Sequence, residues 1–407
     1  IMRGLLSDLE RKNVESIAYR FGQDRVGLQR FVGMANWDDK PLRQELVRQV
    51  GRQLGDSEGV IVFDPSAFPK AGKESVGVAR QWCGRLGKID NCQVGIYMGY
   101  VSHHEHSLVD MRLFLPKEWT KSKTRREKAG VPKSIRYRTR HQLCVEMLQE
   151  HGQSLPHKWI TGDDEMGRSY RFRRNLHALE EQYLLAVPSN TLIRDMEVPK
   201  PDYCGTGRPP NRPWQRVDKW AAETRTAGWK KIDVRDGAKG PLMVQVSSRR
   251  VLARTSQRQE GHEEVLVVIR YRDRDNNRLL KQDYYLSNAA PETAHEEFAR
   301  VAKAEHRIEE CIQRSKSEAG LADYEVRTWR GWHHHQTLSL LATWFLVSEA
   351  RRGKKMDTGN HLTANPRSNI TDPSRIMWMR NDPPYPPRTR ETSRAKRACS
   401  FVPLETT

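Results

Sequence analysis

The spacing of apolar residues divides the chain into segments of different predicted structure. Between residues 5 and 54 the apolar positions recur at helical spacing, with Leu42, Leu46 and Val50 in one stripe among basic residues. This pattern predicts a helical N-terminal region over residues 1–55. A short apolar run follows and ends at Asp64, as a buried central strand does, so we expect Asp64 at the C-terminal end of a strand.

Residues 56–190 combine strand and helix patterns. Two strand-like runs, 92–101 and 108–115, are joined by a polar segment and predict an antiparallel hairpin. The next elements are a helix, a short strand that ends before Asp163, a second helix and a last strand, at 139–151, 159–162, 168–179 and 183–187. This order predicts an α/β fold with a mixed sheet at its core.

The pattern changes between residues 191 and 292. Several prolines break the chain there, and strand-like runs follow at 242–246, 265–271 and 282–286, so we predict a β-rich insertion into the core. Residues 293–350 return to helical spacing and predict the C-terminal helices of the core. The first covers 293–316 and stops near Gly320, and the second, over 337–350, is apolar on most sides and should be buried.

Charge indicates the kind of partner. The formal net charge is +19, from 70 Lys and Arg against 51 Asp and Glu, which favours a polyanion such as nucleic acid. The helical region 1–55 is then a candidate for binding DNA. Residues 351–407 contain twelve Lys or Arg and five acids around a proline-rich run, and we expect this basic tail to be disordered or to become ordered only on DNA.

Other classes fit less well. No run of 18 apolar residues marks a membrane span, so a membrane partner is not expected. The six cysteines form no C-x-x-C pair, which argues against a zinc ribbon or a disulfide framework and favours a reducing compartment. The start of the chain lacks the features of a secretory signal, and because residue 1 is Ile, an N-terminal truncation stays open.

Three acidic residues are predicted at positions from which they can form one site. Asp64 and Asp163 end predicted strands, and Glu309 lies on a predicted helix with Lys316 seven positions later, about two turns along the same face. Three carboxylates can hold two Mg²⁺ ions, and such a pair neutralises charge on both the attacking and the leaving oxygen of a phosphodiester. Taken singly, each acid is more simply a cap, turn or solvated residue, and the choice of Asp163 over Asp164 stays open.

These acids lie in motifs that resemble the DDE transposases of bacterial insertion sequences. The motifs are Val62-Phe63-Asp64-Pro65, Ile160-Thr161-Gly162-Asp163 and Arg307-Ile308-Glu309-Glu310 with Lys316. The resemblance is greatest to the cut-and-paste branch, which carries a β-strand insertion between the second Asp and the Glu, and it covers about residues 5 to 350. It implies an RNase H-like core in two parts, 56–190 and 293–350, separated by the insertion 191–292.

The resemblance also implies a function. A protein of this kind nicks transposon ends and transfers the freed 3′ ends into target DNA, with Asp64, Asp163 and Glu309 holding two Mg²⁺ ions, for which Mn²⁺ can substitute. Its partners are double-stranded DNA with terminal inverted repeats and target DNA. It acts as a homodimer on DNA, in the bacterial cytoplasm at the nucleoid. Arg307 and Lys316 are expected to hold DNA phosphate.

The chain departs from the branch at two places. Ala302 and Glu305 stand where the branch often has Tyr and Arg, so phosphate contacts from those two positions are not expected. Arg307 partly substitutes for them. Met166-Gly167 stands where the branch often has Tyr-Gly, which makes Asp163 rather than Asp164 a choice of register.

Two further features are candidate DNA contacts. Residues 119–140 contain nine Lys or Arg and one acid, and we predict a track along the DNA backbone that includes Lys121, Lys123, Arg125 and Arg126; a solvated loop is the alternative. Related transposases use an aromatic residue of the insertion to hold a flipped base. Trp229 is our candidate for that role, with Trp214 and Trp220 as alternatives, although a tryptophan is more often part of a core.

Two other functions fit the same residues. A structure-specific nuclease of the same fold would cut DNA without joining it. A non-catalytic descendant of a transposase would bind end sequences and cleave nothing.

Overall fold

The computed structural model describes residues 1–359 except 208, 225–227, 235–241, 256–259 and 274–275. Disorder was predicted for residues 351–407, but residues 351–359 belong to the last helix, Trp329–Gly359. Residues 360–407 lie outside the described part. Residues Ile1–Lys354 form one compact unit, and everything below belongs to it apart from the end of the last helix. None of the described helices is long and apolar enough to cross a membrane.

The N-terminal region is helical, as its spacing predicts. Its helices are α1 (Met2–Leu5), α2 (Val14–Arg20), α3 (Arg25–Gly33) and α4 (Lys40–Leu54). The side chain of Asn13 caps α2 by accepting a hydrogen bond from the amide of Ser16, and Asp24 caps α3 in the same way. Leu5, Ile17 and Val32 form a small core together with Leu338 and Ala342 of the last helix. The first three helices therefore pack on the C-terminal part of the compact unit.

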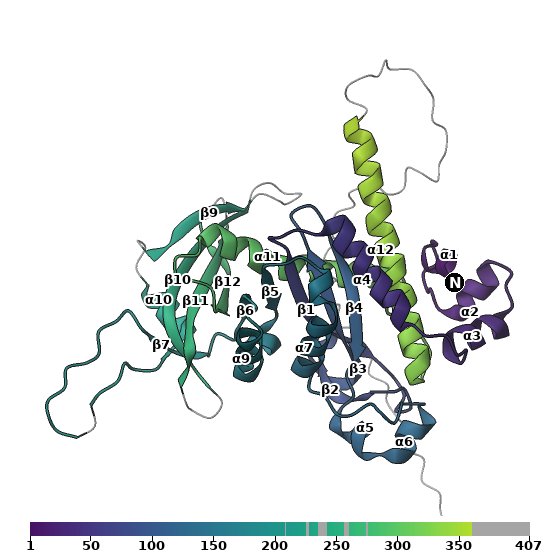
Figure 1. The fold of residues 1–407 in the computed structure, drawn as a ribbon, viewed down its shortest axis with the longest axis horizontal. Helices are drawn as coiled ribbons and strands as arrows, with labels where there is room; N and C mark the ends of the chain where they lie inside the picture. Colours follow the sequence, from purple (N-terminus) through teal and green to yellow (C-terminus); the bar gives the residue numbers. More distant parts are fainter. Residues whose placement is uncertain (208, 225–227, 235–241, 256–259, 274–275, 360–407) are drawn as a thin grey trace, which may run out of the picture. The chain divides into compact units, whose positions relative to one another are not determined.

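A mixed sheet forms the centre of the unit, which confirms the predicted α/β class (Figure 1). Its first strands are β1 (Val60–Pro69), β2 (Ala79–Cys83), β3 (Lys88–Val101), β4 (His106–Leu113), β5 (Trp159–Gly162) and β6 (Tyr183–Ala186). β1 is antiparallel to β3 and parallel to β5, and β5 is parallel to β6. Because β4 pairs with the far side of β3, the order across this part is β4-β3-β1-β5-β6.

The predicted end of the first strand was wrong. β1 does not stop at Asp64 but continues to Pro69, because the long strand β3 keeps pairing with it as far as Pro69↔Cys92. Only the parallel partner β5 ends earlier, at the pair Phe63↔Gly162. The end of an apolar run indicates where the strand becomes less buried. It does not predict how far a strand that is distant in sequence continues to pair.

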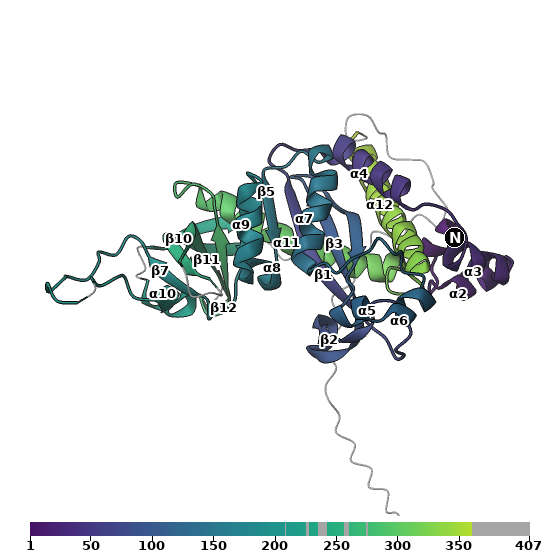
Figure 2. The same ribbon diagram turned by 60° about the horizontal axis from the view of Figure 1, so that its bottom comes forward.

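Helices cover both faces of this sheet. They are α5 (Lys117–Lys121), α6 (Lys123–Lys128), α7 (Arg140–His151), α8 (Asp164–Arg168), α9 (Tyr170–Ala178), α11 (His295–Glu318) and α12 (Trp329–Gly359), with single 3₁₀ turns at Gly84–Leu86 and Gly152–Ser154. Figures 1 and 2 show α7 and α9 in front of the sheet and α11 behind it. α7 begins with a capping box between Thr139 and Gln142.

The insertion adds strands to the same sheet. It contains β7 (Leu192–Asp195), β8 (Gln215–Arg216), β9 (Lys230–Val234), β10 (Leu242–Arg254), β11 (Glu260–Arg272) and β12 (Leu279–Ser287), with α10 (Val217–Glu223). β12 pairs with β6, so the sheet runs on from the core without a break. The predicted strand runs cover only parts of β10, β11 and β12, because polar and charged residues interrupt the apolar runs along these long strands.

Both long C-terminal helices are present, and Gly320 follows the first with a positive φ of 66°. α12 begins at Trp329, eight residues before the predicted start at 337. Thr328 caps this earlier start, since its hydroxyl accepts a hydrogen bond from the amide of Gly331 at 3.1 Å. The predicted burial is confirmed for the first part of this region, with Leu340 and Ala342 fully enclosed, but not for residues 345–350, where Phe345 is 48% exposed.

Candidate active site

The parallel pairing of β1 with β5 brings Asp64 and Asp163 together. Phe63 and Gly162 are the last residues that pair, and an aspartate follows each of them. Neighbouring strands are about 4.8 Å apart, so the two aspartates start from adjacent positions. Phe63 faces α9, where its ring meets Phe172 at 6.5 Å, and the next side chain along a strand points to the opposite face. Asp64 therefore points toward α11.

Helix α11 crosses behind this point with one row of side chains facing the sheet. At its N-terminal end Phe298 packs edge-on against Trp159 of β5, with ring centroids 5.9 Å apart. Glu305 and Glu309 lie two and three turns farther along the same face. Gly99 of β3 allows α11 to approach closely, because a Cβ at that position would lie 2.4 Å from the side chain of Ile308. The sheet and the helix thus fix the acids from both sides.

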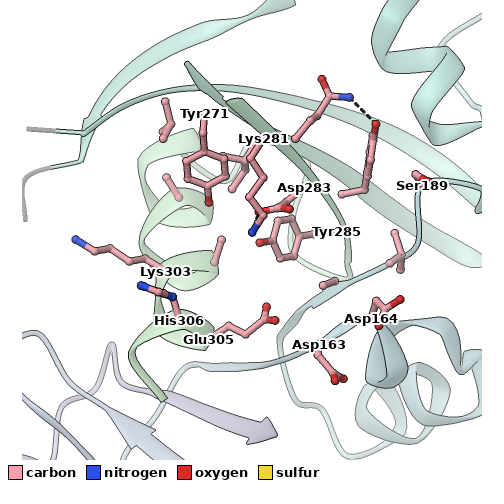
Figure 3. Close-up of a pocket in the computed structure, with 18 of the residues that line it drawn as sticks. Asp163, Asp164, Ser189, Tyr271, Lys281, Asp283, Tyr285, Lys303, Glu305 and His306 are labelled. Atoms are coloured by element: carbon pink, nitrogen blue, oxygen red, sulfur yellow. Dashed lines mark hydrogen bonds and ion pairs between the residues drawn. The ribbon is translucent and has the colours of Figure 1, made fainter. Parts of the chain in front are cut away.

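A cavity of about 670 Å³ opens beside these acids. Figure 3 shows Asp163 and Asp164 at one end of it, Glu305 and His306 on α11, and Lys281, Asp283 and Tyr285 along β12. Glu309 also lines the cavity. The core, the insertion and α11 all contribute walls, so the insertion bounds the space next to the candidate carboxylates.

The carboxylates repel one another. Burial, together with the charges of Asp163 and Glu309, raises the pKa of Asp64 to about 8 against the opposing effect of Lys316. Burial and the neighbouring Glu165 raise the pKa of Asp163 to about 7, although the amide of Met166 stabilises its charged form by a hydrogen bond of 3.1 Å. The nearby positive charge of the protein is therefore too small to offset the cost of ionising these two buried acids.

Lys316 is the predicted phosphate-binding cation that lies near the aspartates. Its ammonium is 5.5 Å from the centre of the Phe68 ring on β1, and its charge acts on Asp64. Burial lowers the pKa of Lys316, while Asp64 acts to raise it. The seven-residue step from Glu309 thus places a cation on the β1 side of the carboxylates.

Glu309 lines the cavity but is largely open to solvent. Its side chain is 65% exposed, and its carboxylate lies 3.7 Å from Nδ1 of His306. In the described part of the chain, no three Asp, Glu, His or Cys side chains are close enough together to hold one metal ion as they stand. Asp64, Asp163 and Glu309 therefore share one neighbourhood without forming a closed set of ligands.

Glu305 is a carboxylate of this neighbourhood that the sequence prediction missed. Burial and the charges of Asp163, Asp64 and Asp283 raise its pKa to about 8. A signal for it was available, because residues four apart on a helix share a face and Glu305 precedes Glu309 by four. In the sequence, position 305 was considered only as a place where the cut-and-paste branch often has Arg and this chain has Glu.

The chemistry of these side chains fits a divalent metal ion. Hard cations such as Mg²⁺ bind carboxylate oxygens, and three acids whose pKa values are raised by burial and mutual repulsion lie together here, with Lys316 as their neighbouring cation. A bound divalent cation would supply the positive charge that the site lacks. Asp64, Asp163 and the glutamates of α11 are the residues that would hold it.

Two other predicted DNA contacts lie away from the cavity. Arg307, on the other side of α11, donates a hydrogen bond of 3.3 Å to the carbonyl of Ser102. Trp229 packs against the core of the insertion, and the guanidinium of Arg270 lies 3.6 Å from its ring centroid. Its indole N–H also donates to the carbonyl of Thr224 at 3.3 Å. Neither residue lines the cavity.

The predicted basic track over residues 119–140 begins with the two short helices α5 and α6 and continues over 129–139 without a helix or strand. Lys121 and Lys123 are exposed, whereas Arg125 and Arg126 donate hydrogen bonds to backbone carbonyls, those of Lys73 and of Pro132 and Ile135. The guanidinium of Arg125 also lies 4.0 Å from the ring of Trp119. The two arginines thus hold the segment in shape. Both lysines are exposed, and Lys123 pairs with Glu127 at 3.9 Å.

Comparison with known proteins gives the family. Residues 1–241, more than half of the chain, match the DDE superfamily endonuclease family. The probable transposase of insertion sequence element IS701 from Microchaete diplosiphon is 30% identical over 199 residues, which are 47% of this chain and 48% of that protein. The match thus spans about half the length of that relative.

A solved structure adds little. Endonuclease V of Ciona intestinalis, bound to a 24mer DNA, covers 78% of this chain and 97% of its own with 9% identity, but its TM-score is 0.22 and does not establish a shared fold. The family assignment therefore rests on the match over residues 1–241, which include Asp64 and Asp163. By that match the chain belongs to the DDE superfamily endonucleases.

Proposed function

We propose that the protein is a DNA transposase of an insertion sequence, which cleaves transposon ends in the presence of Mg²⁺ and transfers the strands into target DNA. The observation that carries this proposal is the position of Asp64 and Asp163, which directly follow the last parallel pair of β1 and β5 and face a helix with further carboxylates. The similarity to a probable transposase supports the choice of reaction.

Each residue has a distinct part in this proposal. Asp64, Asp163 and Glu309 hold the metal ions, for which Mn²⁺ can substitute, and the ions supply positive charge at the attacking and leaving oxygens of the phosphodiester. Lys316 binds a DNA phosphate on the β1 side. Lys121 and Lys123 present exposed charge to the DNA backbone from α5 and α6, although Lys123 also pairs with Glu127 at 3.9 Å. The other predicted DNA contacts require that DNA displaces the present partners of these side chains, which are Arg307, Arg125, Arg126 and Trp229.

The strand order supports an RNase H-like core. In β4-β3-β1-β5-β6, the first three strands form an antiparallel meander and the last two add in parallel, with α7 and α9 in the crossovers. We propose that residues 56–190 and 293–350 are the two parts of this core and 191–292 the insertion. Residues 1–55 bind DNA, and the protein acts as a homodimer on its inverted repeats, at the bacterial nucleoid.

A cleavage and joining assay tests the proposal. The purified chain is incubated with DNA that carries the sequences flanking its gene, with Mg²⁺ or with EDTA, and the products are separated on a denaturing gel. We expect nicks at the element ends and joined products with Mg²⁺, and neither with EDTA. Asp64→Ala and Glu309→Ala proteins should lose both products, and equal activity in either variant would refute the assignment of that residue.

The same gel separates the alternatives. Cleavage without joined products would indicate a nuclease, which the family description also allows. Specific binding of the ends without any metal-dependent product would indicate a non-catalytic descendant. Glu310→Ala serves as the matched control, because Glu310 is an exposed neighbour of Glu309 that pairs with Arg314 at 2.6 Å.

A further inference from the structure

We infer that Glu305 is a metal-binding carboxylate of this site. Before DNA is bound, Glu305 rather than Glu309 completes the ligand set begun by Asp64 and Asp163. The inference rests on the proposed metal-dependent function and adds to it a residue that the sequence motifs do not include.

Orientation is the first observation. Figure 3 shows the Glu305 side chain extending from α11 toward Asp163, while the neighbouring His306 and Lys303 point away from it. Glu305 lines the cavity together with Asp163, and its charge acts on both aspartates. Glu309, one turn later, has a side chain that is 65% exposed and lies beside His306. Of the two glutamates, the earlier one is therefore directed at the aspartates.

The lack of a structural role is the second observation. A partly buried glutamate that serves only the fold normally accepts hydrogen bonds or pairs with a cation, because an unpaired charge in the interior costs free energy. Among the described residues none donates a hydrogen bond to Glu305 or forms an ion pair with it. Lys281, whose charge acts on Glu305, pairs instead with Asp283 at 2.9 Å. The carboxylate is thus free to accept a cation from the cavity.

Helix geometry explains how both glutamates can serve one site. Residues four apart on α11 stand one turn apart, about 5.4 Å along the axis, which matches the reach of two metal ions about 4 Å apart. Glu305 is the glutamate next to Asp163, and Glu309 acts on Asp64. In this arrangement the two aspartates and Glu305 would hold one ion, and Glu309 would be available to a second.

Binding of Mn²⁺ to the full chain without DNA tests the inference. Isothermal titration calorimetry at pH 8 compares wild type with Glu305→Gln, Glu309→Gln, Glu310→Gln and Asp64→Asn. We expect Glu305→Gln to weaken the tighter Mn²⁺ site by about tenfold or more, which is the scale of losing a ligand contact. Glu309→Gln should affect that site less than Glu305→Gln does, and Glu310→Gln should bind as wild type.

Thermal unfolding in EDTA controls for the fold. Glu305→Gln should melt at or above the wild-type temperature, since it removes a repelling charge, and it should lose part of the stabilisation that Mn²⁺ gives the wild type. A variant that melts well below wild type in EDTA would show a structural role and overturn the inference. Glu305→Asp, which keeps a shorter carboxylate, should bind Mn²⁺ more tightly than Glu305→Gln.

The outcomes also separate this inference from the proposed function. If Glu305→Gln binds Mn²⁺ within twofold of wild type while Asp64→Asn loses binding, Glu305 is not a ligand and the proposed metal site stands. If Asp64→Asn also binds as wild type, the proposed metal site itself is wrong.

Discussion

Phe63 of β1 and Gly162 of β5 are the last paired residues of two parallel strands, and an aspartate follows each of them. This one pairing joins positions that are far apart in the sequence and aims both carboxylates at α11. The acids repel one another, so the metal-free site should store unfavourable electrostatic energy. Stability measurements can detect that energy without any DNA substrate.

The first prediction concerns Asp64 and pH. Its pKa is raised from 3.8 to about 8, mainly by burial and by Asp163 and Glu309, so between those values the folded state binds a proton that the unfolded chain has lost. This contribution to stability falls as pH rises from 4 to 8. Without metal, Asp64→Asn should therefore melt higher than wild type, and the difference should widen between pH 6 and pH 8.5. Melting curves in EDTA measure it, and a difference that shrinks with pH would contradict the electrostatic account.

The second prediction concerns the close contact between Gly99 and α11. A methyl group at Gly99 would meet Ile308 at 2.4 Å, so Gly99→Ala should destabilise the fold by about 1–3 kcal/mol and displace the helix that carries the glutamates. Chemical denaturation measures the loss, and Ile308→Val in the same chain should restore part of it. Gly84→Ala is the control, since nothing lies within 4 Å of its added Cβ, and equal losses in both variants would count against the packing argument.

The third prediction concerns the buried ion pair between core and insertion. Nε of Arg173 on α9 lies 2.8 Å from Glu264 on β11, and both side chains are almost fully buried. Arg173→Met removes the guanidinium that balances the buried charge of Glu264, which keeps only the hydroxyl of Tyr183 at 2.6 Å and His262 at 3.9 Å among its described partners, and should cost about 3–5 kcal/mol. The exposed pair of Arg216 with Asp218 is the matched control, and Arg216→Met should cost less than about 1 kcal/mol. Urea unfolding distinguishes the two, and a small loss in Arg173→Met would show that this pair does not hold the insertion to the core.

The fourth prediction concerns Lys316 as a phosphate contact. Lys316→Gln should weaken binding to end DNA. It should also lower the slope of log Kd against log salt concentration by about one, the value expected for the loss of one phosphate contact. Fluorescence anisotropy over a range of salt concentrations measures both effects. Arg314 lies on the same helix but is exposed and paired with Glu310, so Arg314→Gln should change the salt slope less. An unchanged slope in Lys316→Gln would remove Lys316 from the DNA contacts.

The sequence alone predicts much of this fold because its main signals are local. Apolar periodicity located α7, α11 and most of the core strands. It also predicted that Asp163 follows the end of a strand, as it does after β5. What it missed depends on contacts between distant residues. The extension of β1 past Asp64 follows from pairing with β3, and the joining of the insertion to the core sheet follows from the pairing of β12 with β6.

The same limit applies to the site. Motif spacing selected Asp64, Asp163, Glu309 and Lys316 as neighbours, and the structure brings them into one region. Side-chain direction and exposure are not encoded in spacing, so the 65% exposure of Glu309 and the direction of Glu305 toward Asp163 required the structure. The hydrogen bond from Arg307 to the carbonyl of Ser102 joins residues 205 positions apart and could not be predicted from the sequence.

The most direct test of the proposed active site compares Asp163→Asn with Asp164→Asn in Mg²⁺-dependent cleavage of the DNA that flanks the gene. Asparagine keeps the cap on α8, so the first variant removes a negative charge without removing the helix start. Asp164 is exposed and pairs only with Arg168 of the same helix among the described residues. We expect Asp163→Asn to slow cleavage by roughly a hundredfold or more and Asp164→Asn to cleave as wild type. Wild-type cleavage by Asp163→Asn would contradict the account.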